Sequence, residues 1–266
     1  MTPEQRYLFD VTGYLHLKNV LGAEELENAQ KAAERYVRTP YEERPPGFET
    51  EDRQKFVYGF AFDKALEALT LHPVTWPIVK ELTSDRPRLY NGTLAVNTHQ
   101  NARFGTWHCA REDRWQTTRY EVRENRIYCD MFVAFVYLTD VFPGDGGLLV
   151  IPGSHKAEVE RPKSLFVHPD GNSDPDPNPG FANVIPRAGD VVLISELLTH
   201  GILHWRPRDR DRRFLILRYQ PQYLGQGSFP PAILERLSPE TRELAEPAFH
   251  THVKEIVKKD RVTLTV

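Results

Sequence analysis

The hydrophobic pattern predicts helices in the first third of the chain. Residues 23–38 place apolar side chains at helical spacing, which indicates a helix lying on a core. Thr2-Pro3-Glu4-Gln5 has the capping residue, the proline and the glutamine of a helix start, and this helix should run to about Asp10 before Gly13 ends it. Shorter helical turns are expected at 63–70 and 74–82. Tyr14–Leu17 between the first two helices is typical of extended chain.

From Arg88 onward the pattern changes to that of β-strands. Apolar and polar residues alternate around Leu94, Val96 and Thr98. Residues 127–138 lack Pro and Gly and are apolar on both faces except at Asp130, which predicts one long strand inside a sandwich or barrel. Residues 148–151 predict a further strand, so the middle of the chain is expected to be a β domain.

The end of the chain returns to a helical pattern. Residues 232–237 and 239–257 look helical, and 261–266 predict a last edge strand. Residues 41–54 and 169–179 are rich in Pro, Gly or charged residues and predict surface loops. Because no repeat or composition shift divides the sequence, we expect a single domain over 1–266. Its parts are a helical N-terminal region at 1–85, a β-barrel core at about 88–222 and a C-terminal helical extension at 230–266.

Composition narrows the class of partner. The chain is 40% hydrophobic with a net charge of −3, which supports a packed globule and gives no electrostatic case for nucleic acid or an anionic membrane. No apolar run approaches the ~20 residues of a membrane span, and charges interrupt the N-terminus where a signal peptide needs an apolar core. Cys109 and Cys129 are too few for a disulfide scaffold, so both are expected to be reduced. We expect a cytoplasmic protein with a small-molecule partner.

Residues 188–220 contain the first candidate chemistry. They predict a strand over 191–194, a polar loop, and a strand over 214–219, with His200 and an arginine cluster between them. A histidine and an arginine side by side suit a metal with an acidic co-substrate. Taken alone, a structural histidine and a solvated arginine loop explain the same pattern more simply.

Several motifs follow one another in a characteristic order. They are Leu138-Thr139-Asp140, Gly146-Gly147-Leu148, the Val150–Lys156 segment with its Pro-Gly-Ser-His, Gly189-Asp190-Val191, His200-Gly201 and Arg212. Together they resemble the phytanoyl-CoA dioxygenase family of iron(II)/2-oxoglutarate oxygenases, and the resemblance runs from about Tyr7 to Tyr219. It implies a mainly β fold with helical buttresses, namely a double-stranded β-helix of the jelly-roll or cupin type.

The resemblance also implies a metal site. In the family a histidine, a carboxylate two residues later and a distal histidine hold iron, and they leave positions for 2-oxoglutarate and molecular oxygen. His108 and His200 match the two histidines and are predicted to bind iron(II). Ala110 stands at the carboxylate position, and its methyl group has no lone pair to donate.

Three interpretations of Ala110 stay open. Related aliphatic halogenases have Ala or Gly at this position and bind chloride there, which makes halogenation of an aliphatic carbon the leading reaction and Ala110 the open anion position. Alternatively, Asp113, Glu112 or the Cys109 thiolate reaches the metal and the enzyme hydroxylates. The third interpretation is a barrel that binds a small molecule without catalysis.

The predicted anchor for 2-oxoglutarate is an arginine about a dozen residues after the distal histidine. Arg212 has this spacing and the same strand parity as Phe214 and Ile216, so we favour it over Arg213. Asn97 and Thr98 are further candidates for the co-substrate site.

Other polar and aromatic residues receive weaker assignments. Asp130 and Arg218 are expected to pair with each other or to line the cavity. Trp107 and Trp115 either wall a substrate pocket or pack in the core. Of the remaining histidines, His155 is expected to shape a turn, while His99 and His204 fall outside the family's ligand positions.

Overall fold

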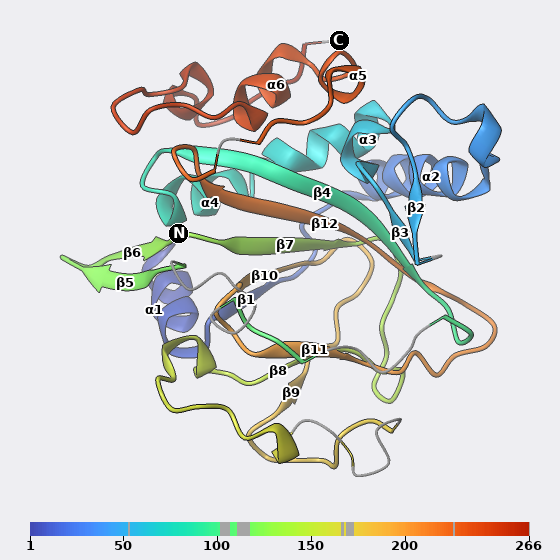
Figure 1. Ribbon diagram of the computed structural model, residues 1–266, viewed down its shortest axis with the longest axis vertical. Coiled ribbons are helices and arrows are strands. Elements are labelled where there is room, and N and C mark those ends of the chain that lie inside the picture. Colours follow the sequence, from blue (N-terminus) through green and yellow to red (C-terminus); the bar gives the residue numbers. More distant parts are fainter. Residues whose placement is uncertain are drawn as a thin grey trace.

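The fold is built on two facing β-sheets with helices on the outside of the larger one, and residues 120–129 form a separate two-stranded sheet (Figure 1). The computed structural model describes residues 1–52, 54–101, 107–110, 118–165, 168, 173–225 and 227–265. Its α-helices are α1 Pro3–Thr12, α2 Ala23–Arg38, α3 Lys64–Glu67, α4 Trp76–Leu82, α5 Pro231–Leu234 and α6 Pro239–Ala245. Its strands are β1 Tyr14–Leu17, β2 Thr50–Glu51, β3 Lys55–Phe56, β4 Pro87–Asn97, β5 Tyr120–Arg123, β6 Arg126–Cys129, β7 Phe132–Tyr137, β8 Gly147–Val150, β9 Ala182–Asn183, β10 Val191–Ser195, β11 His200–Leu203 and β12 Arg212–Pro221.

The order of the strands confirms the predicted jelly-roll class. The large sheet has the order β1-β10-β7-β12-β4-β3-β2, and the small sheet has the order β11-β8-β9. The assigned pairs are antiparallel, with β12 central between β7 and β4. Helices α2, α3 and α4 and the C-terminal helices lie on one side of the large sheet, and the small sheet lies on the other (Figure 1). No helix in the described part of the chain is long and apolar enough to cross a membrane.

Strand β7 shows why the large sheet is buried on both faces. Successive side chains point to opposite faces. Val133, Phe135 and Tyr137 therefore join the cluster between the sheets. Phe132, Ala134 and Val136 join the cluster beneath the helices. A strand with two buried faces reads as a continuous apolar run, which is the pattern that the sequence displays.

The predicted strand over 127–138 is wrong as a single element. The chain forms β6, leaves the extended path at Asp130 and Met131, and then forms β7 in a different sheet. Asp130 explains the break, because its N–H donates to the Arg119 carbonyl and its carboxylate accepts from the Arg119 N–H, at 3.0 and 3.2 Å. Burial raises the pKa of the Asp130 carboxyl. Its partner is Arg119, so the predicted pairing of Asp130 with Arg218 is also wrong.

Three peripheral predictions also needed correction. Residues 41–54, expected to form a loop, include a 3-10 turn at Tyr41–Glu43 and strand β2, which pairs with β3. The helix expected over 239–257 ends at Ala245, and only a 3-10 turn at Glu255–Lys258 follows. The described residues 261–265 form no strand, because Thr265 donates from its backbone and hydroxyl to the Glu240 carboxylate instead.

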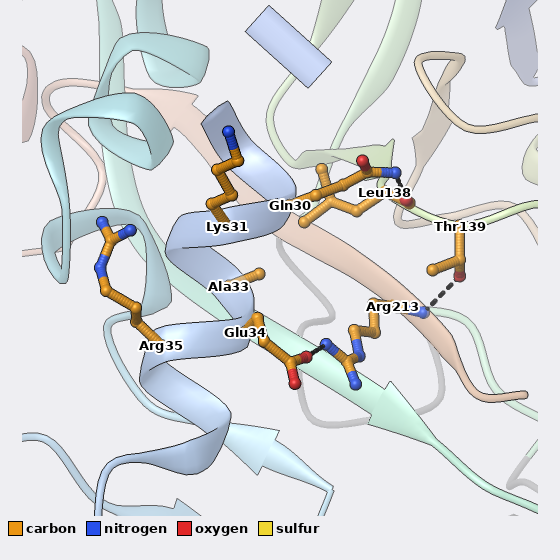
Figure 2. A pocket seen from close by; sticks show the side chains of 8 residues that line it. All are labelled: Gln30, Lys31, Ala33, Glu34, Arg35, Leu138, Thr139 and Arg213. Carbon is orange, nitrogen blue, oxygen red and sulfur yellow. Dashed lines mark hydrogen bonds and ion pairs between the residues drawn. The ribbon is translucent and has the colours of Figure 1, made fainter. Parts of the chain in front are cut away.

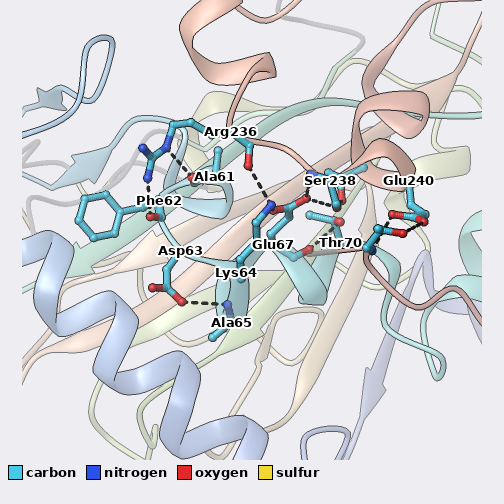
Figure 3. A network of polar contacts seen from close by, with 12 residues as sticks. Ala61, Phe62, Asp63, Lys64, Ala65, Glu67, Thr70, Arg236, Ser238 and Glu240 are labelled. Carbon is cyan, nitrogen blue, oxygen red and sulfur yellow. Dashed lines mark hydrogen bonds and ion pairs between the residues drawn. The ribbon is translucent and has the colours of Figure 1, made fainter.

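A buried carboxylate joins the C-terminal extension to the N-terminal helices (Figure 3). Glu67 of α3 is 1% exposed and accepts hydrogen bonds from the Ser238 N–H, the Ser238 hydroxyl and Lys64 Nζ. Lys64 Nζ also donates to the Arg236 carbonyl at 2.8 Å. Because a buried carboxylate needs such partners, this network fixes how the last helices lie over the sheet.

Candidate functional site

Two histidines far apart in sequence pair directly at the edge of the small sheet. His108 and His200 form an antiparallel bridge in which each N–H donates to the other carbonyl at 3.0 Å. Their rings lie with centroids 4.2 Å apart. Strand β11 begins at His200 and is held in register by β8, where Val150 is the partner of His200. The structure thus brings together the two residues that the sequence proposed as metal ligands.

One ring nitrogen of His200 has a lone pair available for a metal ion. Its Nδ1 lies 2.7 Å from the Leu198 carbonyl. A carbonyl only accepts, so Nδ1 carries the proton and Nε2 keeps its lone pair. Burial, followed by the nearby charge of His108, lowers the pKa of His200 to about 4. The imidazole is therefore neutral at neutral pH, as metal ligation requires.

A third donor, Glu196, faces the same point. A carboxylate oxygen of Glu196 and one nitrogen from each of His108 and His200 all lie within 4.8 Å of one another. Glu196 follows strand β10 and is 8% exposed. The sequence analysis missed this residue, although an acid directly after a fully apolar strand and just before the distal histidine was a usable signal.

Ala110 lies against Glu196. The Ala110 N–H donates to the Glu196 carbonyl at 2.7 Å, and Ala110 is 5% exposed. The other carboxylates considered for the metal, Glu112 and Asp113, lie outside the described residues, as does Trp115. Among the described residues, Glu196 is the carboxylate that accompanies the two histidines.

A pocket of about 330 Å³ opens onto these groups. Its lining residues are Tyr90, Asn91, His108, Ala110, Met131, Glu196 and Arg218. Arg218 Nε donates to Glu196 Oε1 at 3.0 Å. Arg218 therefore lines the cavity, which is one of the two roles expected for it, and Glu196 is its partner.

Arg212 is buried deeper in the barrel with one donor unused. It is 1% exposed, and its Nε and Nη2 donate to Asn97 Oδ1 at 3.1 and 2.5 Å. Within the part of the chain that the structure describes, Arg212 Nη1 is buried and has no hydrogen-bond partner. A Cβ at Gly147 would lie 2.4 Å from Nη1, so glycine is needed there for the guanidinium to fit. The unused N–H suits an acidic ligand.

The neighbouring Arg213 points out of the barrel. Its guanidinium pairs with Asp211 and with Glu34 of α2 beside a groove of about 540 Å³ on the outer face (Figure 2). This groove contains none of the histidines. Strand parity thus places Arg212 inside and Arg213 outside, which favours Arg212 as the co-substrate anchor.

The other residues considered for the site make contacts typical of residues with a structural role. Asn97 accepts from Arg212, whereas the Thr98 N–H and hydroxyl bond to Asn101 in a turn. Trp107 packs on Phe181 with ring centroids 5.7 Å apart. His204 contacts Asp174, and His155 is buried beneath the Tyr120 ring. Cys109 and Cys129 are both free and buried, in agreement with the expectation of reduced thiols.

The chain belongs to the phytanoyl-CoA dioxygenase family, because the sequence profile of that family matches residues 9–202. Members of this family are iron(II)/2-oxoglutarate-dependent oxygenases. Peroxisomal phytanoyl-CoA dioxygenase of Mus musculus is 25% identical over 224 residues, which cover 76% of this chain and 63% of the mouse protein. The chain thus spans less than two thirds of that relative.

Solved structures give the same picture of the fold. HygX from Streptomyces hygroscopicus, with nickel and 2-oxoglutarate bound, is 25% identical with a TM-score of 0.68, covering 83% of this chain and 87% of HygX. Apo EctD from S. alaskensis is 21% identical with a TM-score of 0.63, covering 84% of this chain and 78% of EctD, and supports the fold alone.

Proposed function

We propose that this protein uses iron(II), 2-oxoglutarate and molecular oxygen to hydroxylate an aliphatic carbon of a small polar molecule. The proposal rests on two features that lie inside the same barrel. The rings of His108 and His200 face the Glu196 carboxylate, and the buried Arg212 keeps Nη1 unused within the described residues. A barrel that only binds a small molecule needs no such donor set.

The residues present fit the two groups that the family implies. His108 and His200 would hold the iron through neutral nitrogens, and Arg212 would bind the far carboxylate of 2-oxoglutarate through Nη1. Asn97 would keep the guanidinium oriented, because it accepts from both Nε and Nη2. HygX, the relative solved with 2-oxoglutarate, gives independent support for that co-substrate.

Bound iron supplies the oxidising chemistry, in which one oxygen atom converts 2-oxoglutarate to succinate and CO2 and the other enters a C–H bond as a hydroxyl group. The balance is one O2, one 2-oxoglutarate and one substrate consumed for one succinate, one CO2 and one alcohol. The protein's own contribution is position. The histidines fix the metal at the pocket, and Arg212 fixes the co-substrate from deeper in the barrel.

The pocket suggests the class of substrate. Tyr90, Asn91 and Arg218 offer hydroxyl, amide and guanidinium groups beside Met131. Such a lining suits a molecule with several hydroxyl or acidic groups and an aliphatic carbon near the metal. HygX is also solved with hygromycin B bound, which is consistent with a polar small molecule in a barrel of this kind.

Halogenation is the second candidate, and Ala110 favours it. The methyl group lines the pocket where the family has a carboxylate, so chloride has room if Glu196 stays with Arg218. The reaction would consume one chloride and one proton and release water in place of adding a hydroxyl group to the substrate.

The test is turnover without a known substrate. Wild-type protein with iron(II), 2-oxoglutarate and air should form succinate while it consumes oxygen, and anaerobic addition of 2-oxoglutarate to the iron complex should give a weak visible absorption band. His200→Ala should lose both signals. A wild type that shows neither signal would contradict the proposed function. Candidate polar substrates can then be screened with and without chloride, and mass spectrometry distinguishes a hydroxylated from a chlorinated product.

A further inference from the structure

We propose that Glu196 is the third protein ligand of the metal, so that the carboxylate comes from the end of β10 and not from position 110. The inference rests on the proposed function and makes it more specific. Ala110 leaves the family's carboxylate position without a donor, while Glu196 presents a carboxylate to the same two histidines. The three side chains form a two-histidine, one-carboxylate set assembled from different positions.

The three donor atoms lie close enough together to bind one metal ion after a small movement. Adjacent ligand atoms of an octahedral metal lie about 3 Å apart when each bond is about 2.1 Å. The three donor atoms here lie within 4.8 Å of one another, so less than about 2 Å of movement closes the set. His200 is anchored through Leu198, which leaves rotation of the Glu196 side chain to supply most of this movement.

The backbone brings residues 110 and 196 together. The Ala110 N–H donates to the Glu196 carbonyl, and both residues line the pocket of the histidines. The small methyl of Ala110 leaves room for the longer glutamate side chain. A carboxylate at 110 would bring a second negative charge to the same cavity, where like charges close together are unfavourable.

Arg218 is the positioning residue for this carboxylate. Its Nε donates to Glu196 Oε1 at 3.0 Å, which orients the carboxylate. A carboxylate has two oxygens, so it can ligate with one while it accepts from Arg218 with the other. Such hydrogen-bonded ligating carboxylates are the common arrangement in metal sites. With the third protein position filled in this way, hydroxylation is the reaction that follows.

The experiment measures metal binding without turnover. Cobalt(II) is titrated into metal-free protein in the absence of 2-oxoglutarate, followed by calorimetry and by the visible spectrum of the bound ion. Glu196→Gln should weaken binding roughly 100-fold, because loss of a direct ligand exceeds the effect of losing its supporting contacts. Asp130→Asn is the matched control. It alters another buried carboxylate that pairs with an arginine, and it should bind cobalt within about threefold of wild type.

A second variant separates ligation from folding. Adding Ala110→Asp to the Glu196→Gln protein restores a carboxylate at the family position and should recover at least roughly tenfold of the lost affinity. Arg218→Gln should weaken binding roughly tenfold while the cobalt spectrum keeps its shape, as expected for a residue that acts through Glu196.

The outcomes are distinguishable. If wild type binds cobalt, His200→Ala does not, and folded Glu196→Gln binds as wild type does, the Glu196 assignment is overturned while the proposed function stands. A chloride-dependent change of equal size in the cobalt spectra of wild type and Glu196→Gln would likewise overturn it, because chloride would then find the same open positions with and without the Glu196 carboxylate. If wild type itself fails to bind cobalt, the proposed function fails as well.

Discussion

Arg212 and Arg213 lie on opposite faces of strand β12 and have different kinds of partner. On the outer face, Arg213 is paired with Glu34 (Figure 2) and with Asp211, both supplied by the protein. On the inner face, Arg212 is fully buried, bonds only to the neutral Asn97 and keeps Nη1 unused within the described chain. Burial of a charge without an ionic partner is costly, and the contact of the guanidinium with the Phe214 ring offsets this cost only in part. The outer arginine has the surroundings of a structural residue, whereas the inner one has those expected of the proposed ligand anchor.

Replacing each arginine in turn is the strongest test of the difference between Arg212 and Arg213. Arg212→Ala should weaken 2-oxoglutarate binding by roughly 100-fold or more, because it removes the buried fork that meets the carboxylate. Arg213→Ala should change it less than about twofold and cost about 1 kcal/mol of unfolding free energy, because its ion pairs are partly exposed. Equilibrium dialysis and urea unfolding measure the two effects. Equal losses of 2-oxoglutarate binding in both variants would refute the division of roles.

A variant at Glu67 tests whether a buried network outside the site affects stability without affecting metal binding. Glu67→Ala removes the acceptor of the Ser238 N–H and hydroxyl and of Lys64 beneath the C-terminal helices (Figure 3). We expect a loss of about 2 kcal/mol in unfolding free energy, because buried donors lose their partner. Cobalt affinity should be unchanged, and Glu240→Ala, which removes only exposed contacts, should cost about 0.5 kcal/mol. A large loss of cobalt binding in the Glu67 variant would show that the outer network also shapes the site.

Acid should destabilise the packing around His155, which lies beneath the Tyr120 ring. Burial, followed by the charge of Lys156, lowers the pKa of this ring to about 4, although Asp10 acts in the opposite direction. The unfolded chain therefore binds the proton more readily, and the stability due to the neutral ring, complete above about pH 6.5, is lost as pH falls towards 4.

His155→Phe should reduce this pH dependence. The slope of unfolding free energy between pH 6.5 and 4 should fall by up to about 1.4 kcal/mol per pH unit in metal-free protein, while His200, with the same shift, keeps its own contribution. Urea unfolding across this range is the measurement. An unchanged slope would show that His155 protonates equally well in both states.

The smallest effect tests the space around Arg212. Gly147→Ala places a methyl group against Nη1 and should weaken 2-oxoglutarate binding roughly fivefold. Gly144→Ala is the matched control, since both glycines have positive φ but nothing lies within 4 Å of a Cβ at 144. Equilibrium dialysis should show unchanged binding in the control, and an equal loss in both variants would attribute the effect to backbone strain.

Much of the fold was predictable from local pattern. Helix α2 spans the predicted residues because its apolar face, acidic start and basic end agree. The jelly-roll class followed from the motifs, and the inward side of Arg212 followed from parity. The strand expected over 127–138 failed because one polar residue, Asp130, redirected the chain through a contact with Arg119 that sequence spacing does not reveal.

The candidate site was predictable only in part. His108, His200 and Arg212 fell on recognisable positions, but no sequence rule places Glu196 opposite Ala110. That proximity arises from the crossing of segment 107–110 over the end of β10, which is a tertiary event. Local pattern identifies donors, whereas the folded chain decides which donors meet.

The mutual bridge of His108 and His200 has a consequence for how the protein folds. The two residues lie far apart along the chain, so their pairing closes a long loop that local helices cannot nucleate. A metal held by both residues binds the native chain and has no preformed site in the unfolded one, so its binding energy adds directly to native stability. If the two histidines hold iron as proposed, the iron supply would set the amount of folded protein, because chains without metal would unfold more often and be degraded sooner.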